Sequence, residues 1–324
     1  MASRYHPPEK NRQAGPTGGN RITTALMLAA GTGSRLRPHT EKIPKCLVEV
    51  GGKPLLAHVL EALEVRGFRR FVIITGYRHK LIDEFLEQYD TPLDVETVFN
   101  DQYDSTNNIY TLWFAGKFVD EPFLLLESDL IFEPDVLAEL CRPDRIALDR
   151  YNPELHSGTT ATVTACGHLA SLFINDPAPP DAFTYKTVNI YSFSRETWRA
   201  VHPALEKKLA AGNVDSFYEA AIRDLVDEGA IRLKMADFSD SWWDEIDSEV
   251  DLDRANRNFT SISAANNLSA LVNGKLRTNM NGKLQTSMNG KPQCNMNRKS
   301  QSSMNAMPQK SMNGTAHNSL NGKP

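Results

Sequence analysis

Short apolar runs alternate with segments of helical periodicity over the first half of the chain. Apolar runs that end at glycine or polar residues indicate buried strands, and apolar residues spaced three and four apart indicate helices. The pattern predicts strands over residues 24–29, 71–75, 93–99 and 122–126, and helices over residues 55–65, 79–89, 107–118 and 134–141. Strands and helices that alternate in this way are typical of a mainly parallel sheet covered on both faces. The sequence therefore predicts an α/β fold.

The pattern changes after residue 145, where short strands follow one another before helices return. The second half predicts strands over residues 159–165, 169–174, 186–193 and 231–236, and helices over residues 195–210, 215–228 and from about 250 onward. We expect this part to belong to the same α/β domain and to lie over its first part as a lid.

The two ends of the chain differ from this body. Residues 1–22 are polar and rich in proline, and they lack the apolar core of a signal peptide. Residues 263–324 contain methionine at every eighth position from 280 to 312, in a setting of asparagine, glycine and lysine. Such a repeat offers too little apolar surface to offset the entropy of ordering, and its period keeps no stripe on one helix face. We expect both ends to be disordered around a domain at residues 23–262, with partner binding as the alternative role of the tail.

Charge and composition exclude several classes of protein. The net charge is −4, and residues 267–324 hold eight Lys or Arg and no Asp or Glu, so the body is more acidic than the whole chain. An acidic body without a basic stripe argues against a nucleic-acid-binding protein. The four cysteines are far apart, which indicates free thiols, and no apolar run is long enough for a membrane helix. We expect a cytoplasmic protein without a membrane span.

A glycine-rich segment, LMLAAGTGSRLRPHTEKIPK at residues 26–45, follows the first predicted strand directly. Small residues there would let a flat base approach the backbone, and glycines would let successive N–H groups point into one anion-binding concavity. Basic residues would surround that concavity with positive charge. The residues concerned are Ala29, Ala30, Gly31, Gly33, Arg35, Arg37 and Lys45. The segment predicts a polyphosphate site.

Three glycine-loop motifs compete for this segment. The dinucleotide motif fails because its third glycine position holds Leu36, and the Walker motif fails because no Gly-Lys-Ser/Thr follows. The remaining string, G-x-G-x-R-L followed by Pro44-Lys45, resembles the signature of the sugar-phosphate nucleotidyltransferase family. The resemblance implies a Rossmann-like, mainly parallel mixed sheet of the nucleotide-diphospho-sugar transferase type. An ordinary strand-to-helix turn with exposed basic residues is the alternative.

The resemblance also implies two acidic ligands for Mg²⁺. Asp129 follows the predicted strand at 122–126, and Asp247 lies in the string Glu-Ile-Asp-Ser at 245–248. Carboxylate oxygens are the ligands that Mg²⁺ prefers. Each aspartate could instead cap the helix that follows it. Asp244 and Glu245 are expected behind the ligands or at the surface.

Further strings resemble the cytidylyltransferases that activate small aminoalkyl phosphates and phosphonates. These are ESDLIFEPDVL at 127–137, YKTVNIYSFS at 185–194 and Asn-Asn-x-Tyr at 107–110. The 2-aminoethylphosphonate cytidylyltransferases resemble the chain more closely than the bacterial phosphocholine cytidylyltransferases do. Two positions depart from the pattern: Glu127 replaces an aspartate, and LHSGTTATV at 155–163 lacks an aromatic residue before its Gly-Thr.

The resemblance implies that CTP and 2-aminoethylphosphonate react to give CMP-2-aminoethylphosphonate and diphosphate, as a step in phosphonate biosynthesis. A phosphonate is already an anion at neutral pH, so no general base is required. Phosphocholine or a sugar 1-phosphate are alternative acceptors, and a nucleotide-binding scaffold without activity is the alternative outside enzymes. The expected nucleotide-binding residues are Leu28, Ala29, Ala30, Gly31, Thr32, Gly33, Ser34 and Asn107. A homodimer is left open.

Three basic residues are expected to act in catalysis. Arg35 would neutralise the leaving phosphates, Lys45 would bridge the α-phosphate and the acceptor oxyanion, and Lys186 would hold the phosphonate unless it is a solvated strand residue. A quaternary ammonium would favour aromatic faces, whereas a primary ammonium would favour carboxylates. The candidates for the acceptor and its amine are Lys186, Tyr185, Trp242, Trp243, Tyr110, Trp113, Asp240, Asp244 and Glu127. Tyr110 and Trp113 could instead be core residues, and Asn107 and Asn108 could cap a helix.

Overall fold

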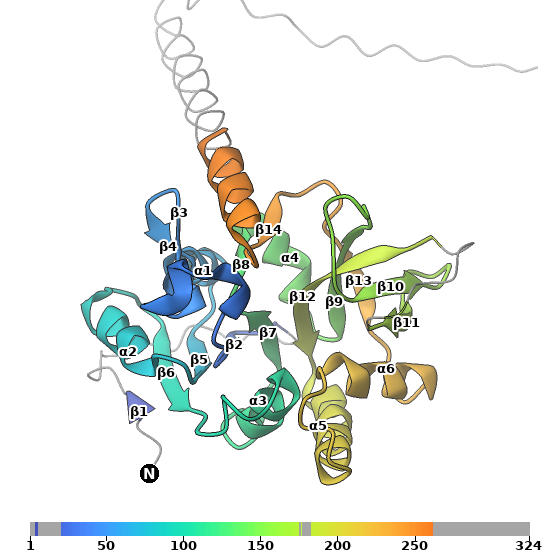
Figure 1. Ribbon diagram of the computed structural model, residues 1–324. Helices are drawn as coiled ribbons and strands as arrows, with labels where there is room; N and C mark the ends of the chain where they lie inside the picture. Colours follow the sequence, from blue (N-terminus) through green and yellow to red (C-terminus); the bar gives the residue numbers. More distant parts are fainter. Residues whose placement is uncertain (1–3, 6–20, 175, 177–182, 262–324) are drawn as a thin grey trace, which may run out of the picture. The chain divides into compact units, whose positions relative to one another are not determined.

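The computed structural model describes residues 4–5, 21–174, 176 and 183–261 (Figure 1). The disorder expected over residues 1–22 and 263–324 falls almost wholly outside these ranges and stays a prediction, as do the domain boundaries. Within the described part of the chain, no helix combines the length and the apolar character needed to cross a bilayer.

A parallel block forms the centre of the sheet. It consists of β6 (Asp94–Phe99), β5 (Arg70–Thr75), β2 (Thr24–Ala29) and β7 (Phe123–Glu127), in that order. All three neighbouring pairs are parallel, and every residue of β2 is buried. Continuous apolar strands of this kind belong to a sheet covered on both faces, as the sequence predicts.

Beyond β7 the sheet continues with mixed polarity through the long strand β12 (Tyr185–Phe193), which runs antiparallel to β7. One edge of β12 also pairs with β10 (Thr160–Val163), and the other edge pairs with β9 (Arg145–Arg150). The outer strands are β11 (Leu169–Phe173) beside β10, β13 (Lys234–Asp237) beside β9, and β1 (Arg4–Tyr5) at the far edge beside β6.

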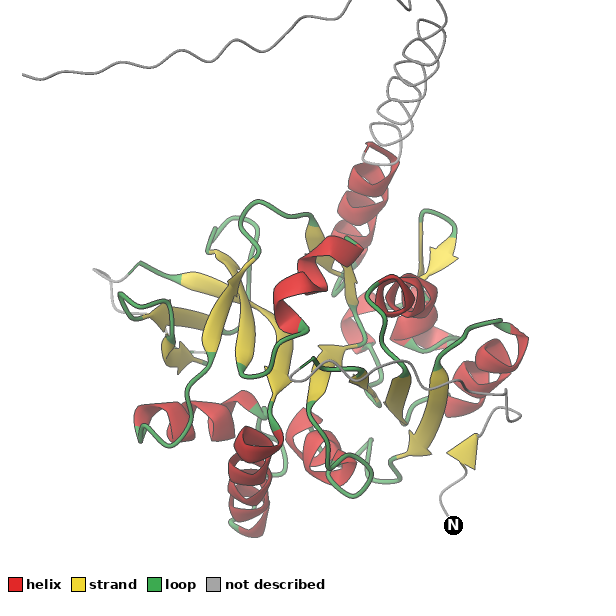
Figure 2. Cartoon of the chain, turned by 180° about the vertical axis from the view of Figure 1, so that it is seen from behind, coloured by secondary structure: helices red, strands yellow, loops and turns green. Residues whose placement is uncertain are grey.

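The prediction that the second half forms a lid over the first is therefore wrong. The strands after residue 145 extend the sheet edge to edge and do not lie over it (Figures 1 and 2). The predicted α/β fold with a mixed sheet is confirmed. The sequence pattern missed β9 because its three apolar residues are flanked by charged ones.

Helices cover both faces of the sheet. One face carries α1 (Leu55–Val65), α2 (His79–Gln88) and the short α4 (Leu137–Leu140), and the other carries α3 (Asn108–Ala115), α5 (Arg195–Ala210) and α6 (Glu219–Asp227). Alternation along β2 explains this division: Met27 points to the first helix layer and Leu26 and Leu28 to the second. The predicted helix at 134–141 is a 3-10 turn, η4 (Pro134–Val136), followed by α4, and the one predicted at 215–228 begins four residues later.

Short elements place the functional residues above the parallel block. The glycine-rich segment forms three 3-10 turns, η1 (Ser34–Leu36), η2 (His39–Glu41) and η3 (Lys45–Leu47). A short hairpin follows, formed by β3 (Glu49–Val50) and β4 (Lys53–Pro54), which have two residues each. The strands β8 (Leu130–Phe132) and β14 (Trp243–Glu245) pair antiparallel, with Leu130 opposite Glu245. A helix over residues 249–261 ends the described part.

A small apolar cluster fastens these short elements together. Leu36 from the glycine-rich segment, Ile131 from β8 and Leu252 from the last helix all contribute buried side chains to it. The Ile246 backbone N–H donates to the carbonyl of Asp129 at 2.9 Å. Distant parts of the sequence thereby meet at the carboxyl end of β7, where ligands bind in open α/β sheets.

Candidate active site

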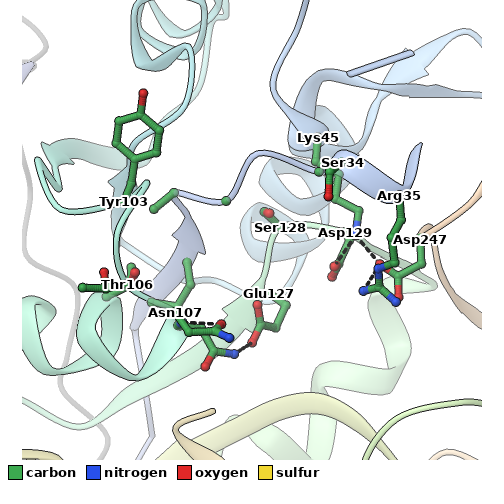
Figure 3. A pocket seen from close by; sticks show the side chains of 16 residues that line it. Ser34, Arg35, Lys45, Tyr103, Thr106, Asn107, Glu127, Ser128, Asp129 and Asp247 are labelled. Carbon is green, nitrogen blue, oxygen red and sulfur yellow. Dashed lines mark hydrogen bonds and ion pairs between the residues drawn. The ribbon is translucent and has the colours of Figure 1, made fainter. Parts of the chain in front are cut away.

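A cavity of about 270 Å³ lies at the carboxyl ends of β2 and β7 (Figure 3). Its walls come from the glycine-rich segment, from the start of α3, from the end of β7 and from the segment after β14. The sixteen lining residues are Leu28, Ala30, Gly31, Gly33, Ser34, Arg35, Lys45, Tyr103, Thr106, Asn107, Asn108, Thr111, Glu127, Ser128, Asp129 and Asp247. We call it the first cavity. It contains most of the expected nucleotide-binding residues and both expected metal ligands. Ala29 and Thr32 belong to the same segment but are not among the lining residues.

The glycine loop leaves its backbone open to a ligand. An added Cβ at Gly31 would meet nothing within 4 Å, so a ligand can approach the main chain closely there. Gly33 has a left-handed φ of +62°, and a Cβ there would lie 3.0 Å from a methyl carbon of Thr40. The Thr40 hydroxyl also donates to the Gly33 carbonyl at 2.7 Å. These contacts fix the loop in a conformation that favours glycine.

Three carboxylates meet between the glycine loop and β14. One oxygen each of Asp129, Glu245 and Asp247 can be chosen so that all lie within 4.8 Å of one another. The Lys45 ammonium donates to Asp129 at 2.7 Å and to Asp247 at 2.6 Å (Figure 3). Burial acts to lower the pKa of Lys45, but the two carboxylates outweigh it and the pKa is raised. The ammonium is therefore charged throughout the physiological range.

This cluster fits a divalent cation. The Oδ1 atom of Asp129 is buried and has no hydrogen-bond partner among the described residues, so it offers a lone pair to a further ligand. Hard carboxylate oxygens of this number suit Mg²⁺, with phosphate oxygens completing the coordination. Sequence reasoning missed Glu245 as a third donor. The pairing of β8 with β14 brings it there, because that pairing places Glu245 opposite the residue after Asp129.

Arg35 lies at the mouth of the first cavity. Its guanidinium donates to Asp247 at 2.9 Å, but its side chain is 71% exposed. An exposed ion pair of this kind contributes little to stability. Little stability would therefore be lost if Arg35 left Asp247.

The inner wall of the first cavity is acidic and braced by asparagines. Glu127 has its pKa raised well above the usual value, first by burial and then by the charge of Asp129. Asn108 donates to the Glu127 carboxylate at 3.3 Å and accepts from the Tyr218 backbone N–H at 3.1 Å. Asn107 caps α3 by accepting from the Asn108 backbone N–H at 2.7 Å, so the capping role holds for Asn107 although it also lines the cavity.

A second cavity, of about 170 Å³, begins on the other side of Asp247. Its walls come from the loop after β9, from β12, from β14 and from the last helix: Leu155, His156, Ser157, Lys186, Trp243, Asp244, Glu245, Asp247, Asp251, Arg254 and Asn258. Asp247 lines both cavities. The carboxylate cluster thus stands where the two cavities adjoin.

Lys186 is buried in the wall of the second cavity, with its side chain 2% exposed. It donates to the carbonyl of Thr187 at 2.7 Å and lies 3.3 Å from a carboxylate oxygen of Glu245. The alternative of a solvated strand lysine is therefore wrong. Burial raises the pKa of Glu245, against the opposing charge of Lys186. A buried cation beside the carboxylate cluster is suited to an anionic ligand.

The aromatic and acidic candidates for the acceptor separate into two groups. Trp243 and Asp244 line the second cavity, although the Asp244 carboxylate is already bound by the Arg254 guanidinium, with Nε at 3.0 Å. Trp242 contacts the small apolar cluster and Phe259. Tyr185 packs against the apolar core on the face of the sheet that α3, α5 and α6 cover. Neither Tyr185 nor Trp242 appears among the described residues that line the two cavities. Tyr110, Trp113 and Asp240 are likewise not among them, and Trp113 packs against the core.

Comparison with known proteins agrees with this geometry. The sequence profile of the family described as nucleotidyl transferase matches residues 24–145. A CMP-5′-(3-aminopropyl)phosphonate synthase of Streptomyces rubellomurinus is 31% identical over 246 residues, which are 73% of this chain and 38% of that protein. A choline-phosphate cytidylyltransferase of Streptococcus pneumoniae is 38% identical over 109 residues, 34% of this chain and 46% of that protein. The chain thus spans less than half the length of these curated relatives.

The fold is shared with solved structures. A CTP:phosphocholine cytidylyltransferase from Streptococcus pneumoniae superposes with a TM-score of 0.62 at 21% identity, over 74% of this chain and 99% of that one. A UDP-glucose pyrophosphorylase superposes with a TM-score of 0.63 at 17% identity, over 74% and 99% of the two chains. The predicted nucleotide-diphospho-sugar transferase fold and the resemblance to the nucleotidyltransferase family are confirmed.

Proposed function

We propose that this chain is a metal-dependent cytidylyltransferase of the cytoplasm that converts CTP and 2-aminoethylphosphonate into CMP-2-aminoethylphosphonate and diphosphate. The observation that carries the proposal is the pair of cavities that share Asp247. One cavity has an open glycine loop for a nucleotide triphosphate, and the other has a buried lysine for an anionic acceptor. Their junction is a carboxylate cluster that fits a divalent cation, and such a cation would neutralise the negative charge of the transferred phosphate.

The residues of the first cavity suit the nucleotide. Backbone N–H groups around Gly31 and Gly33 would hold the triphosphate, and Arg35 would leave Asp247 to neutralise the departing diphosphate. Lys45 already reaches the junction and would bridge the α-phosphate and the acceptor oxygen. A Mg²⁺ ion held by Asp129, Glu245 and Asp247 would act as a Lewis acid toward the phosphate oxygens.

The second cavity suits a small acceptor with an anionic head and a primary ammonium. Lys186 supplies the positive charge for the head, and no general base is needed because the acceptor is already an anion. Its described lining residues include two carboxylates outside the metal cluster, Asp244 and Asp251, but a single tryptophan, Trp243. A primary ammonium, with three N–H donors, fits carboxylates better than it fits one aromatic face. The aminopropylphosphonate named in the Streptomyces relative is an acceptor of this class.

An acceptor panel tests this proposal. The purified protein is incubated with CTP, Mg²⁺ and one acceptor at a time, and diphosphate release is followed. We expect 2-aminoethylphosphonate to react with the highest kcat/KM, 3-aminopropylphosphonate to be close to it, and phosphocholine and glucose 1-phosphate to be much slower. A clear preference for phosphocholine or for the sugar phosphate would overturn the acceptor assignment.

A matched variant separates an enzyme from a nucleotide-binding scaffold. Asp129→Asn keeps the size of the side chain but removes the charge at the junction. We expect it to lower the rate of diphosphate release by about 10²- to 10⁴-fold while the far-ultraviolet circular dichroism stays unchanged. If the wild-type protein binds CTP and releases no diphosphate with any acceptor, the scaffold alternative replaces the enzyme.

A further inference from the structure

The loop between β9 and β10 contributes a residue that sequence reasoning did not assign. We propose that His156 binds the anionic head of the acceptor by donating a hydrogen bond from Nε2, next to the ammonium of Lys186. The inference rests on the proposed function, because it concerns the acceptor of that reaction. It makes His156 a substrate-binding residue of the second cavity, which it lines.

A tight turn at residues 152–156 holds the imidazole in place. The backbone N–H groups of Leu155 and His156 donate to the carbonyl of Asn152 at 3.1 and 2.8 Å, and the N–H of Glu154 donates to the Asn152 side chain at 3.0 Å. The backbone N–H of Asn152 in turn lies 3.2 Å from Nδ1 of His156. The side chain is therefore tied to the start of its own turn.

This last contact assigns the tautomer. An N–H can donate to Nδ1 only if that nitrogen has a free lone pair, so the ring proton of the neutral imidazole must be on Nε2. Burial lowers the pKa of His156, which agrees with a neutral ring. Among the residues that the structure describes, Nε2 contacts no hydrogen-bond acceptor. His156 therefore offers a free N–H donor at the wall of the cavity.

Stacking fixes the plane of the ring. The imidazole lies against the indole of Trp243, with ring centroids 5.8 Å apart and planes inclined by 29°. The Trp243 Nε1–H donates to Asp149 at 2.8 Å, so the indole is itself held from behind. A donor whose ring is fixed by both stacking and a hydrogen bond loses little freedom when a ligand binds.

The segment that follows His156 passes close to Lys186. A Cβ at Gly158 would lie 3.8 Å from the Lys186 ammonium nitrogen, and the φ of +88° favours glycine there. Ser157, which carries a hydroxyl group, lines the same cavity. A neutral N–H donor, a hydroxyl and an ammonium are thus gathered from residues 156, 157 and 186.

This set of donors selects the end of the acceptor that it binds. A phosphonate or phosphate head carries three oxygens that accept hydrogen bonds, whereas an ammonium group carries donors alone and cannot pair with the N–H of Nε2. The His156 side of the cavity therefore holds the head, and the amine must extend toward other residues.

Two substitutions distinguish hydrogen bonding from stacking. His156→Phe keeps an aromatic ring against Trp243 but removes the donor, and His156→Gln keeps an amide donor but removes the ring. Binding is measured by ³¹P NMR titration with 2-aminoethylphosphonate and with ethylphosphonate, which lacks the amine. The α,β-methylene analogue of CTP is present throughout, so that no transfer occurs. His168→Gln, outside both cavities, is the control.

We expect His156→Phe to weaken the binding of both phosphonates by the same factor, about 10- to 100-fold for one hydrogen bond to a charged group, and His156→Gln to weaken both less. The proposal is overturned if His156→Phe binds both phosphonates like the wild type, if only 2-aminoethylphosphonate is affected, or if the wild type binds neither. Normal phosphonate binding without diphosphate release from CTP would instead contradict the proposed function and leave the role of His156 in binding intact.

Discussion

Replacing Lys45 by methionine tests the electrostatics of the junction directly. Methionine fills much of the same volume but removes the ammonium that contacts Asp129 at 2.7 Å and Asp247 at 2.6 Å. The three carboxylates, each of which has an oxygen within 4.8 Å of the others, would then repel one another without this cation. Breaking a fully buried ion pair costs about 3–5 kcal/mol. Both aspartate side chains keep 16% exposure, so we expect the lower end, about 3 kcal/mol, in the absence of divalent ions.

Magnesium should reverse much of this loss. In the wild type a cation must compete with the Lys45 ammonium for the same carboxylates, whereas in Lys45→Met it would not. At a free Mg²⁺ concentration of about 100 times the Kd, binding to the folded state alone adds about 2.7 kcal/mol. The assay is urea unfolding followed by circular dichroism, once with a chelator and once with Mg²⁺. The variant should gain more stability from Mg²⁺ than the wild type, although its transferase activity is lost.

The control for this experiment is Lys53→Met. Lys53 forms an exposed ion pair with Glu61 at 2.6 Å, and such pairs contribute roughly 1 kcal/mol or less. This substitution should change stability little, with or without Mg²⁺. The reasoning would be refuted if Lys45→Met were as stable as the wild type in the chelator, or if Mg²⁺ stabilised both proteins equally.

Three further predictions follow from the same structure. Asp129→Asn should lower kcat by about 10²- to 10⁴-fold, because a carboxylate that would hold the metal cation is lost; near-normal kcat in the diphosphate assay would contradict this. Burial raises the pKa of Glu219 from 4.5 to about 7, so its contribution to stability is present below pH 4.5 and is lost as the pH rises through 7. We therefore expect the free energy of unfolding in urea of Glu219→Gln, relative to that of the wild type, to rise by about 3 kcal/mol between pH 4.5 and 8. For the control Glu228→Gln, the difference from the wild type should stay the same over this range. Removing residues 267–324 should leave kcat/KM within about twofold in the diphosphate assay, because all lining residues of both cavities lie between 28 and 258; a collapse would assign the tail a part in catalysis.

The sequence could predict the parts of the site that lie on local motifs. Gly31, Gly33 and Asp129 each follow a continuous apolar strand, and the ends of neighbouring parallel strands must meet at one edge of a sheet. The family resemblance allowed Asp247 to be predicted, because the string Glu-Ile-Asp-Ser can be recognised without knowing its place in the fold. These residues do line the first cavity.

The rest depends on contacts that no local pattern encodes. Neighbouring residues of an extended segment point to opposite sides, so the sequence could not decide which of Trp242 and Trp243 faces the acceptor. Glu245 joins the carboxylate cluster through the pairing of two three-residue strands, which are too short to show a period. His156 became visible only with the turn that ties Nδ1 to Asn152. The lid was expected because the strands after residue 145 are short, whereas β12 in fact continues the sheet.

The sharing of Asp247 by both cavities has a stereochemical consequence for the proposed reaction. The nucleotide would reach this carboxylate from the glycine loop, and the acceptor would reach it from the side of β12 and the last helix. With the two reactants on separate sides, a phosphonate oxygen can attack opposite the departing diphosphate, in one displacement and without a covalent enzyme adduct. A CTP made chiral at the α-phosphorus by a sulfur substituent would then yield product of inverted configuration.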